Sequence, residues 1–144
     1  MTAAAELGYA AFVERNTPRY QRYAAARLPS GGCTGVVATT LAEARARWAF
    51  ILSQPSPAAE VWLDLRRRVS DVAERTVPSG SELAKLYERF GPRLADSVVL
   101  CRHLGLGVDE AAELMGAEAS AVTANLAVTQ RRLPDLLGGR PPLI

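Results

Sequence analysis

The 144-residue chain has little cysteine and histidine, and this shortage excludes several kinds of site. Its two cysteines, Cys33 and Cys101, and its one histidine, His103, cannot supply the four ligands of a structural zinc site. No nucleophile or carboxylate converges on His103 by spacing, so we expect a protein that is not an enzyme and binds no cofactor or metal. We expect the cysteines to be free thiols in a reducing compartment.

Long hydrophobic runs are also absent. The longest uncharged stretch, residues 28–42, is interrupted by proline and glycine and is too short to span a bilayer. Residues 1–11 contain Glu6 and no basic side chain, unlike a secretory signal. We therefore expect a cytoplasmic protein with no membrane partner.

An excess of positive charge is missing as well. The chain has 17 basic and 15 acidic side chains, a net charge of +2, which argues against a protein that coats polyanions. Lys85 is the single lysine, so nearly all the basic residues are arginine. Residues 1–74 carry +2, Arg75 adds +1, and residues 82–144 carry −1.

Apolar residues recur at helical spacing along the chain, without an internal repeat or a sustained strand-like alternation. The pattern predicts an all-α fold of two small helical bundles. We expect one bundle over residues 1–74, a linker over 75–81, a second bundle over 82–138 that contains a helix-turn-helix, and a loose tail over 139–144.

Turn and capping residues set the expected helix boundaries. Asn16-Thr17-Pro18 predicts a stop and restart after a first helix over residues 3–15. A helix over 34–52 has Val37, Leu41 and Trp48 on its apolar face. Further helices are expected to begin at Ser56-Pro57, at a capping box of Ser79 and Glu82, and after Gly91-Pro92.

Residues 105–133 give the strongest motif. A short helical segment closed by Gly116 precedes a longer one over residues 119–133, as in a helix-turn-helix. Val122, Leu126 and Leu133 form the expected inner face of the second helix. An ordinary helical hairpin is the alternative.

The segment VVLCRHLGLGVDEAAELMGAEASAVTANLAVTQRRL, residues 98–133, resembles the fourth region of extracytoplasmic-function sigma factors of bacterial RNA polymerase. In that family a leucine-rich helix, a Gly-Leu-Ser turn, an Ala-Glu-Ile-Ala-like helix and a recognition helix with a basic end follow in this order. YAAFVERNTPRYQRYAAARL and AEVWLDLRRRVSDVAE resemble helices of the family's second region.

The resemblance implies contacts to promoter DNA and to core RNA polymerase. The residues implied in DNA binding are Ser120, Thr123, Ala124, Asn125, Arg131, Arg132, Arg66 and Arg67. Asn125 can bond adenine, and Thr123 or Ala124 can touch a thymine methyl. A solvated basic face is the alternative for the Arg66–Arg68 run.

The polymerase-binding helix of the family opens with a run of acidic residues. The matching stretch here, residues 32–48, has Glu43 as its only carboxylate. We therefore expect a more apolar interface with polymerase or another partner, formed by Val36, Val37, Thr40, Leu41, Arg45 and Trp48.

Two functions follow from the resemblance. The first is a sigma-like transcription initiation protein that associates with polymerase and addresses promoter DNA; its acidic second half predicts weak DNA binding without a partner. The second is a repurposed sigma-like protein that regulates transcription through contacts with a protein regulator or co-activator. A DNA-binding repressor is a third interpretation.

Overall fold

The computed structural model describes the backbone of residues 1–136 and the side chains of residues 1–132. Every regular element in this part of the chain is helical, which confirms the expected all-α class. The described residues divide into two compact units. The N-terminal unit contains residues 1–76 together with 114–116, and the C-terminal unit contains the other described residues. The expected tail, residues 139–144, lies outside the described residues.

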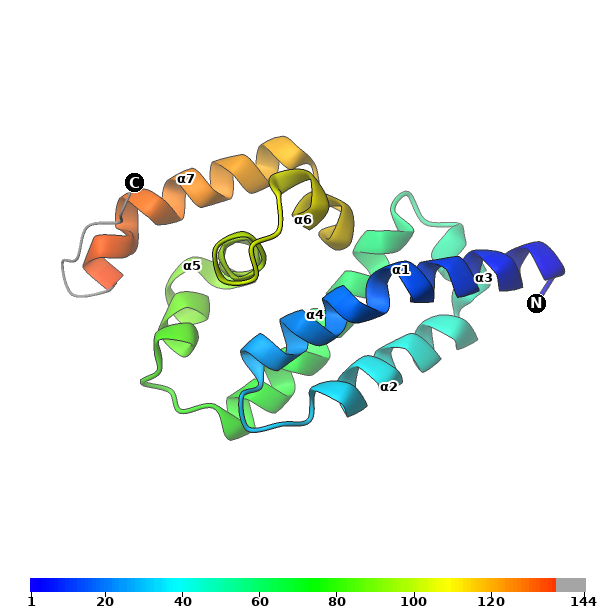
Figure 1. The fold of residues 1–144 in the computed structure, drawn as a ribbon, viewed down its shortest axis with the longest axis horizontal. Helices are drawn as coiled ribbons and strands as arrows, with labels where there is room; N and C mark the ends of the chain where they lie inside the picture. The colour runs from blue at the N-terminus through cyan, green and yellow to red at the C-terminus, as the bar shows by residue number, and fades with distance from the viewer. Residues whose placement is uncertain (137–144) are drawn as a thin grey trace. The chain divides into compact units, whose positions relative to one another are not determined.

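Four helices form the N-terminal unit: α1 (Ala3–Arg27), α2 (Cys33–Ala46), α3 (Trp48–Leu52) and α4 (Pro57–Thr76). Helices α1, α2 and α4 lie side by side and contact one another in all three pairs (Figure 1). Because α4 continues to Thr76, Arg75 belongs to this helix and not to a linker.

The expected break at Asn16-Thr17-Pro18 is wrong, because α1 continues through Pro18. The Asn16 amide donates to the carbonyl of Phe12 at 2.9 Å, and the Thr17 hydroxyl donates to that of Val13 at 2.6 Å. Aromatic rings from both sides of the proline pack into one core, which holds the two halves of α1 in a single helix.

Aromatic side chains dominate this core. The Trp48 ring lies 5.4 Å from the rings of both Tyr9 and Phe12, and the Trp62 ring lies 4.5 Å from that of Tyr23 and 6.0 Å from that of Tyr20. The two tryptophans are almost fully buried. The Tyr9 hydroxyl donates to the carbonyl of Leu41 at 2.8 Å and ties α1 to α2.

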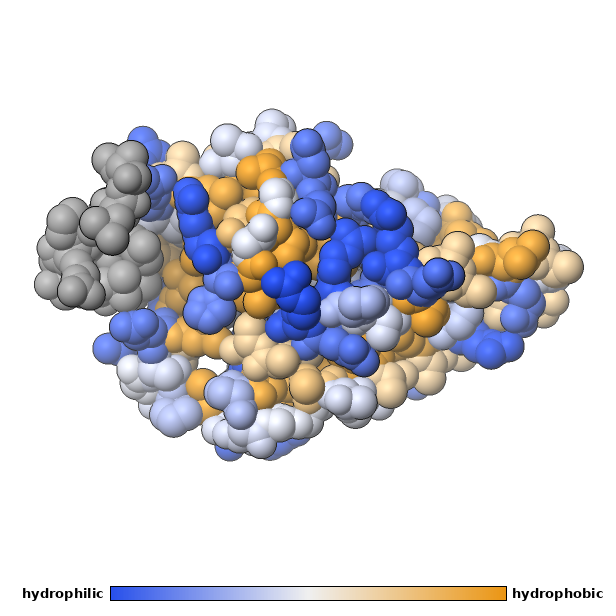
Figure 2. Space-filling view, viewed as in Figure 1, coloured by the Kyte–Doolittle hydropathy of each residue, from blue (hydrophilic) through white to orange (hydrophobic). Residues whose placement is uncertain are grey.

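The expected helix over residues 34–52 is two helices, because the backbone leaves the helical conformation at Arg47 (φ −109°, ψ 17°). The start of α4 agrees with expectation: the Ser56 hydroxyl accepts a hydrogen bond from the Ala59 N–H at 3.2 Å. Met1 and Leu7 expose more than half of their surface, and Figure 2 shows apolar surface at the N-terminal end of α1.

The C-terminal unit contains α5 (Glu82–Val98), a short π-helix η1 (Val99–His103), α6 (Val108–Met115) except for its last two residues, and α7 (Ala119–Leu136). Ser81, and not Ser79, caps α5, because its hydroxyl accepts from the Ala84 N–H at 3.1 Å. The restart expected at Gly91-Pro92 is present as a kink at Gly91 (φ 80°, ψ 168°).

The kink in α5 is bridged by a side-chain hydrogen bond. The Tyr87 hydroxyl, before the kink, donates to a carboxylate oxygen of Asp96, after it, at 2.5 Å. Asp96 is fully buried, so this bond serves a carboxylate that water does not reach. Helix α5 packs against α7, which continues past residue 133, where the sequence predicted its end.

Candidate nucleic-acid interface

Helices α6 and α7 are joined by a tight turn at Gly116. Gly116 has φ 66°, and the N–H of Ala117 donates to the carbonyl of Ala112 at 2.9 Å, which closes the last turn of α6. At the other end of α6, a carboxylate oxygen of Glu110 accepts from the Gly107 N–H at 3.4 Å. The short helix, the turn and the longer helix are compatible with the expected helix-turn-helix.

One side of α7 is buried and the opposite side is exposed. Val122, Leu126 and Thr129 are buried, and the Thr129 hydroxyl donates back to the carbonyls of Asn125 and Leu126, each at 3.0 Å. The exposed side carries residues of one stripe at helical spacing, which we call the α7 outer face: Ser120, Thr123, Ala124, Ala127 and Arg131.

Asn125 does not lie on the α7 outer face. It is half-buried, and its amide nitrogen donates to the Ser97 hydroxyl on α5 at 3.2 Å. The expectation that this side chain points outward toward an adenine is wrong, because the amide is used within the C-terminal unit. Helical spacing already carried the signal: Asn125 follows Val122 by three residues and precedes Thr129 by four, and both neighbours are buried.

The two arginines near the end of α7 are both exposed. The guanidinium carbon of Arg132 lies 5.6 Å from the centre of the Phe90 ring, a cation–π contact with α5. Arg131 lies on the α7 outer face and adds its positive charge there. The side chain of Leu133 lies outside the described side chains.

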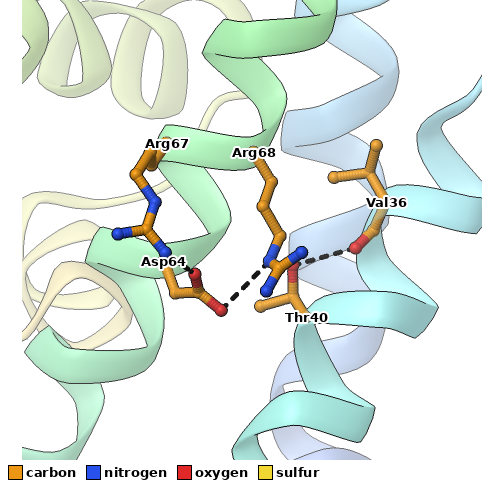
Figure 3. Close-up of polar contacts among 5 residues, drawn as sticks. All are labelled: Val36, Thr40, Asp64, Arg67 and Arg68. Carbon is orange, nitrogen blue, oxygen red and sulfur yellow. Dashed lines mark hydrogen bonds and ion pairs between the residues drawn. The ribbon is translucent and has the colours of Figure 1, made fainter.

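The arginine run on α4 is partly neutralised by one carboxylate. Arg67 and Arg68 contact different oxygens of Asp64, at 2.5 and 3.2 Å, and Figure 3 shows both guanidinium groups directed at it. Arg66 is half-buried. Asp64 therefore offsets part of the positive charge that the three arginines present at this surface.

Four of the six residues expected to bind polymerase or another partner belong to the core instead. Val37, Thr40, Leu41 and Trp48 are buried, and the Thr40 hydroxyl donates to the carbonyl of Val36 at 2.8 Å (Figure 3). They cannot form a contact surface, because α2 and α3 turn these side chains toward α1 and α4.

The remaining two expected partner residues are accessible. Val36 is half-buried, and Arg45 is exposed and paired with Glu6 at 3.1 Å. Partial burial raises the pKa of Tyr9, while the charge of Arg45 beside it acts in the opposite direction. The exposed side of α2 carries small and mostly uncharged residues: Thr34, Gly35, Ala38, Thr39, Ala42, Glu43 and Ala46.

The cysteines are separate free thiols, and burial raises the pKa of Cys101, with the nearby charge of Arg102 acting in the opposite direction. Among the described residues, no cluster of histidine, cysteine and carboxylate side chains has the arrangement of a metal site. No helix in the same part of the chain has the length and apolar character needed to cross a bilayer.

Comparison of the chain with protein-family models, with curated proteins and with solved structures gives no match. The features that bear on function are therefore the geometry of α6 and α7, the distribution of charge and the sequence resemblance of residues 98–133.

Proposed function

We propose that this protein is a cytoplasmic, sigma-like transcription initiation protein that associates with core RNA polymerase and reads promoter DNA with the α7 outer face. The observation that carries the proposal is the tight turn at Gly116, followed by a helix with one buried side and one exposed side. Such a helix can enter a major groove while its buried side holds it on the domain.

The side chains of the α7 outer face fit close approach to base edges. Ala124 and Ala127 add no bulk, and the methyl group of Thr123 can contact a thymine methyl. Ser120 and Arg131 supply hydrogen-bond donors at the two ends of the stripe. Recruitment, and no chemical step, would be the mechanism.

The negative charge of the second half of the chain is the reason to expect weak binding to isolated DNA. Residues 82–144 carry a net charge of −1, and Asp109, Glu110 and Glu113 are exposed on α6. Phosphate contacts supply much of the affinity of DNA-binding proteins. Attachment to polymerase would raise the local concentration of the domain at the promoter and offset this loss.

Selection of DNA sequences tests the proposal. Bacterial core polymerase and the full chain are mixed with random duplexes, and bound DNA is sequenced. We expect an enriched motif that requires both proteins. The double substitution Ala124→Glu with Ala127→Glu places two carboxylates against the groove and should lower affinity for the motif at least about tenfold, since one base contact contributes about 1–3 kcal/mol. Ala25→Glu, exposed on α1, is the control and should have no effect.

The exposed side of α2 favours the second function, regulation through protein contacts alone. Its small uncharged residues could accept a partner helix at close range. Ala42→Glu with Ala46→Glu tests this side. The second function replaces the first under two conditions. The α2 pair must abolish recovery of a regulator protein that the α7 pair (Ala124→Glu with Ala127→Glu) still recovers, and no DNA motif must be enriched.

A further inference from the structure

Helices α5 and α7 pack antiparallel, so the middle of α5 lies beside the C-terminal end of α7. The Asn125 amide nitrogen donates to the Ser97 hydroxyl at 3.2 Å, and the guanidinium carbon of Arg132 lies 5.6 Å from the centre of the Phe90 ring. From the first contact to the second, the chain advances seven residues on α7 and goes back seven residues on α5. Residues next to Phe90 therefore lie near the end of α7 that carries Arg131.

Two exposed arginines flank Phe90 on α5. Arg89 directly precedes it, and Arg93 follows it by three residues. The length of the chain keeps the Cα atoms of Arg89 and Arg93 within about 4 and about 11 Å, respectively, of that of Phe90. We call Arg89, Arg93 and Arg132 the α5–α7 arginine cluster. The family resemblance implies Arg132 in DNA binding, but neither arginine of α5.

Hydrogen bonds hold the α5 backbone of the cluster in place. The Tyr87 hydroxyl donates to Asp96 across the kink, and the Ser97 hydroxyl donates to the carbonyl of Arg93 at 3.0 Å. The same Ser97 hydroxyl accepts from Asn125, so the turn of helix that carries Arg93 is connected directly to α7. A site that is ordered before its ligand arrives loses less conformational entropy on binding. The backbone of the cluster is therefore preorganised for a ligand.

Charge is distributed unevenly along α7. Glu118 is exposed next to its N-terminal end, whereas the cluster lies at its C-terminal end. On α5, Glu82 and Glu88 each lie three residues from Lys85 and share its side of the helix. Glu88 directly precedes Arg89, but consecutive residues of a helix do not face each other. The positive end of α7 is therefore the end to which α5 adds its arginines.

We propose that the α5–α7 arginine cluster binds phosphate groups of duplex DNA at the C-terminal end of α7, without regard to sequence. From Ser120 to Arg131 the α7 outer face is about 16 Å long, and the major groove is about 12 Å wide. A helix of this length that lies across the groove reaches the phosphate backbone with one end, and the arginines favour the C-terminal one. Guanidinium groups bind phosphate in a bidentate manner. The inference rests on the proposed function, because the α7 outer face defines where the DNA lies.

Salt dependence measures these phosphate contacts. The full chain is titrated into a fluorescent 20-base-pair duplex of mixed sequence between 50 and 200 mM NaCl, and fluorescence anisotropy gives the association constant K. Each phosphate contact contributes about 0.9 to the slope of log K against log salt concentration. Arg89→Gln with Arg93→Gln, called the α5 pair, should therefore reduce the slope by about 1.8. Arg89→Lys with Arg93→Lys should keep most of the slope, because lysine retains the charge.

A matched control pair separates a local contact from the general effect of charge. Arg47→Gln with Arg75→Gln removes the same charge from exposed positions of the N-terminal unit and should leave the slope nearly unchanged. Arg132 stays in every variant, so its contact with Phe90 is kept. Circular dichroism establishes that each variant is folded.

Three outcomes would overturn the proposal. The first is no binding of the wild-type chain to duplex DNA at 50 mM salt, and the second is an equal loss of slope in the α5 pair and the control pair. The third is binding of poly-glutamate that depends on the cluster and is tighter than binding to the duplex. This last result would identify an acidic protein as the ligand.

Failure of this inference is distinguishable from failure of the proposed function. In the selection with core polymerase, the α5 pair should weaken binding to every duplex by a similar factor and leave the enriched motif unchanged, because phosphate contacts carry no sequence information. The α7 pair should remove the motif. An enriched motif with a salt slope that the α5 pair does not change rejects the inference alone. A slope that depends on the cluster, without any enriched motif, rejects the proposed function and leaves the phosphate contacts standing.

Discussion

In the N-terminal unit, aromatic rings fill the space between the helices, whereas the C-terminal unit is packed mainly with alanine, valine and leucine. Trp48 and Trp62 bring α1 into contact with the rest of the N-terminal unit. In the C-terminal unit, Ala95 and Ala111 are fully buried. We therefore expect the stability of the N-terminal unit to be sensitive to lost side-chain volume, and that of the C-terminal unit to added volume.

The substitution Trp62→Ala is the largest test of this comparison. It removes a ring that is 1% exposed and that contacts two tyrosines, so it should lower the free energy of unfolding by about 3–5 kcal/mol. Urea denaturation followed by circular dichroism measures the change. Trp62→Phe keeps a ring in place and should cost less; equal costs for the two variants would show that ring volume is not what matters.

Adding volume tests the C-terminal unit. Ala95 is 0% exposed on α5, so Ala95→Leu should force neighbouring side chains out of place and lower the free energy of unfolding by about 1–3 kcal/mol. The same change at Ala121, exposed on α7, is the control. If the Ala95→Leu variant has the same urea midpoint of unfolding as the wild type, the core of the C-terminal unit can accept added volume, and the comparison of the two units is wrong.

Tyr20 provides the smallest test, because its hydroxyl is buried without a hydrogen-bond partner among the described residues. Tyr20→Phe removes this polar group and should raise the free energy of unfolding by about 1 kcal/mol. A loss of stability on urea denaturation at pH 7 would instead indicate that the hydroxyl is satisfied in solution.

The pH dependence of the same variant gives a second measurement. Burial raises the pKa of Tyr20 above the ordinary value of 10.0, against a smaller opposing effect of the Arg19 charge. As the pH rises above 10, the unfolded chain releases this proton while the folded chain retains it. Wild-type stability should therefore fall above pH 10, and Tyr20→Phe should show a shallower fall.

Local signals in the sequence predicted several features that the structure contains. Ser56 caps α4, Gly116 ends α6 in a left-handed conformation, and Gly91 interrupts α5. Each depends on the chemistry of one or two residues, so neighbouring sequence was sufficient to find it. The outward side of α7 at Ser120, Thr123 and Ala124 likewise follows from helical spacing.

Features that depend on distant partners were predicted wrongly. Asn125 turns toward Ser97, which is 28 residues away, and Thr40 is buried between helices although it is polar. Val37, Leu41 and Trp48 have the apolar character of either a core or an interface. Only the packing of α1 and α4 against α2 distinguishes these two possibilities.

The sequence by itself determined the helical class, the turn between α6 and α7, and the near balance of positive and negative charge. The tertiary structure alone decided that α1 runs unbroken through Pro18. A proline inside a helix costs about 3 kcal/mol, and burial of Phe12 and Tyr20 on its two sides offsets that cost.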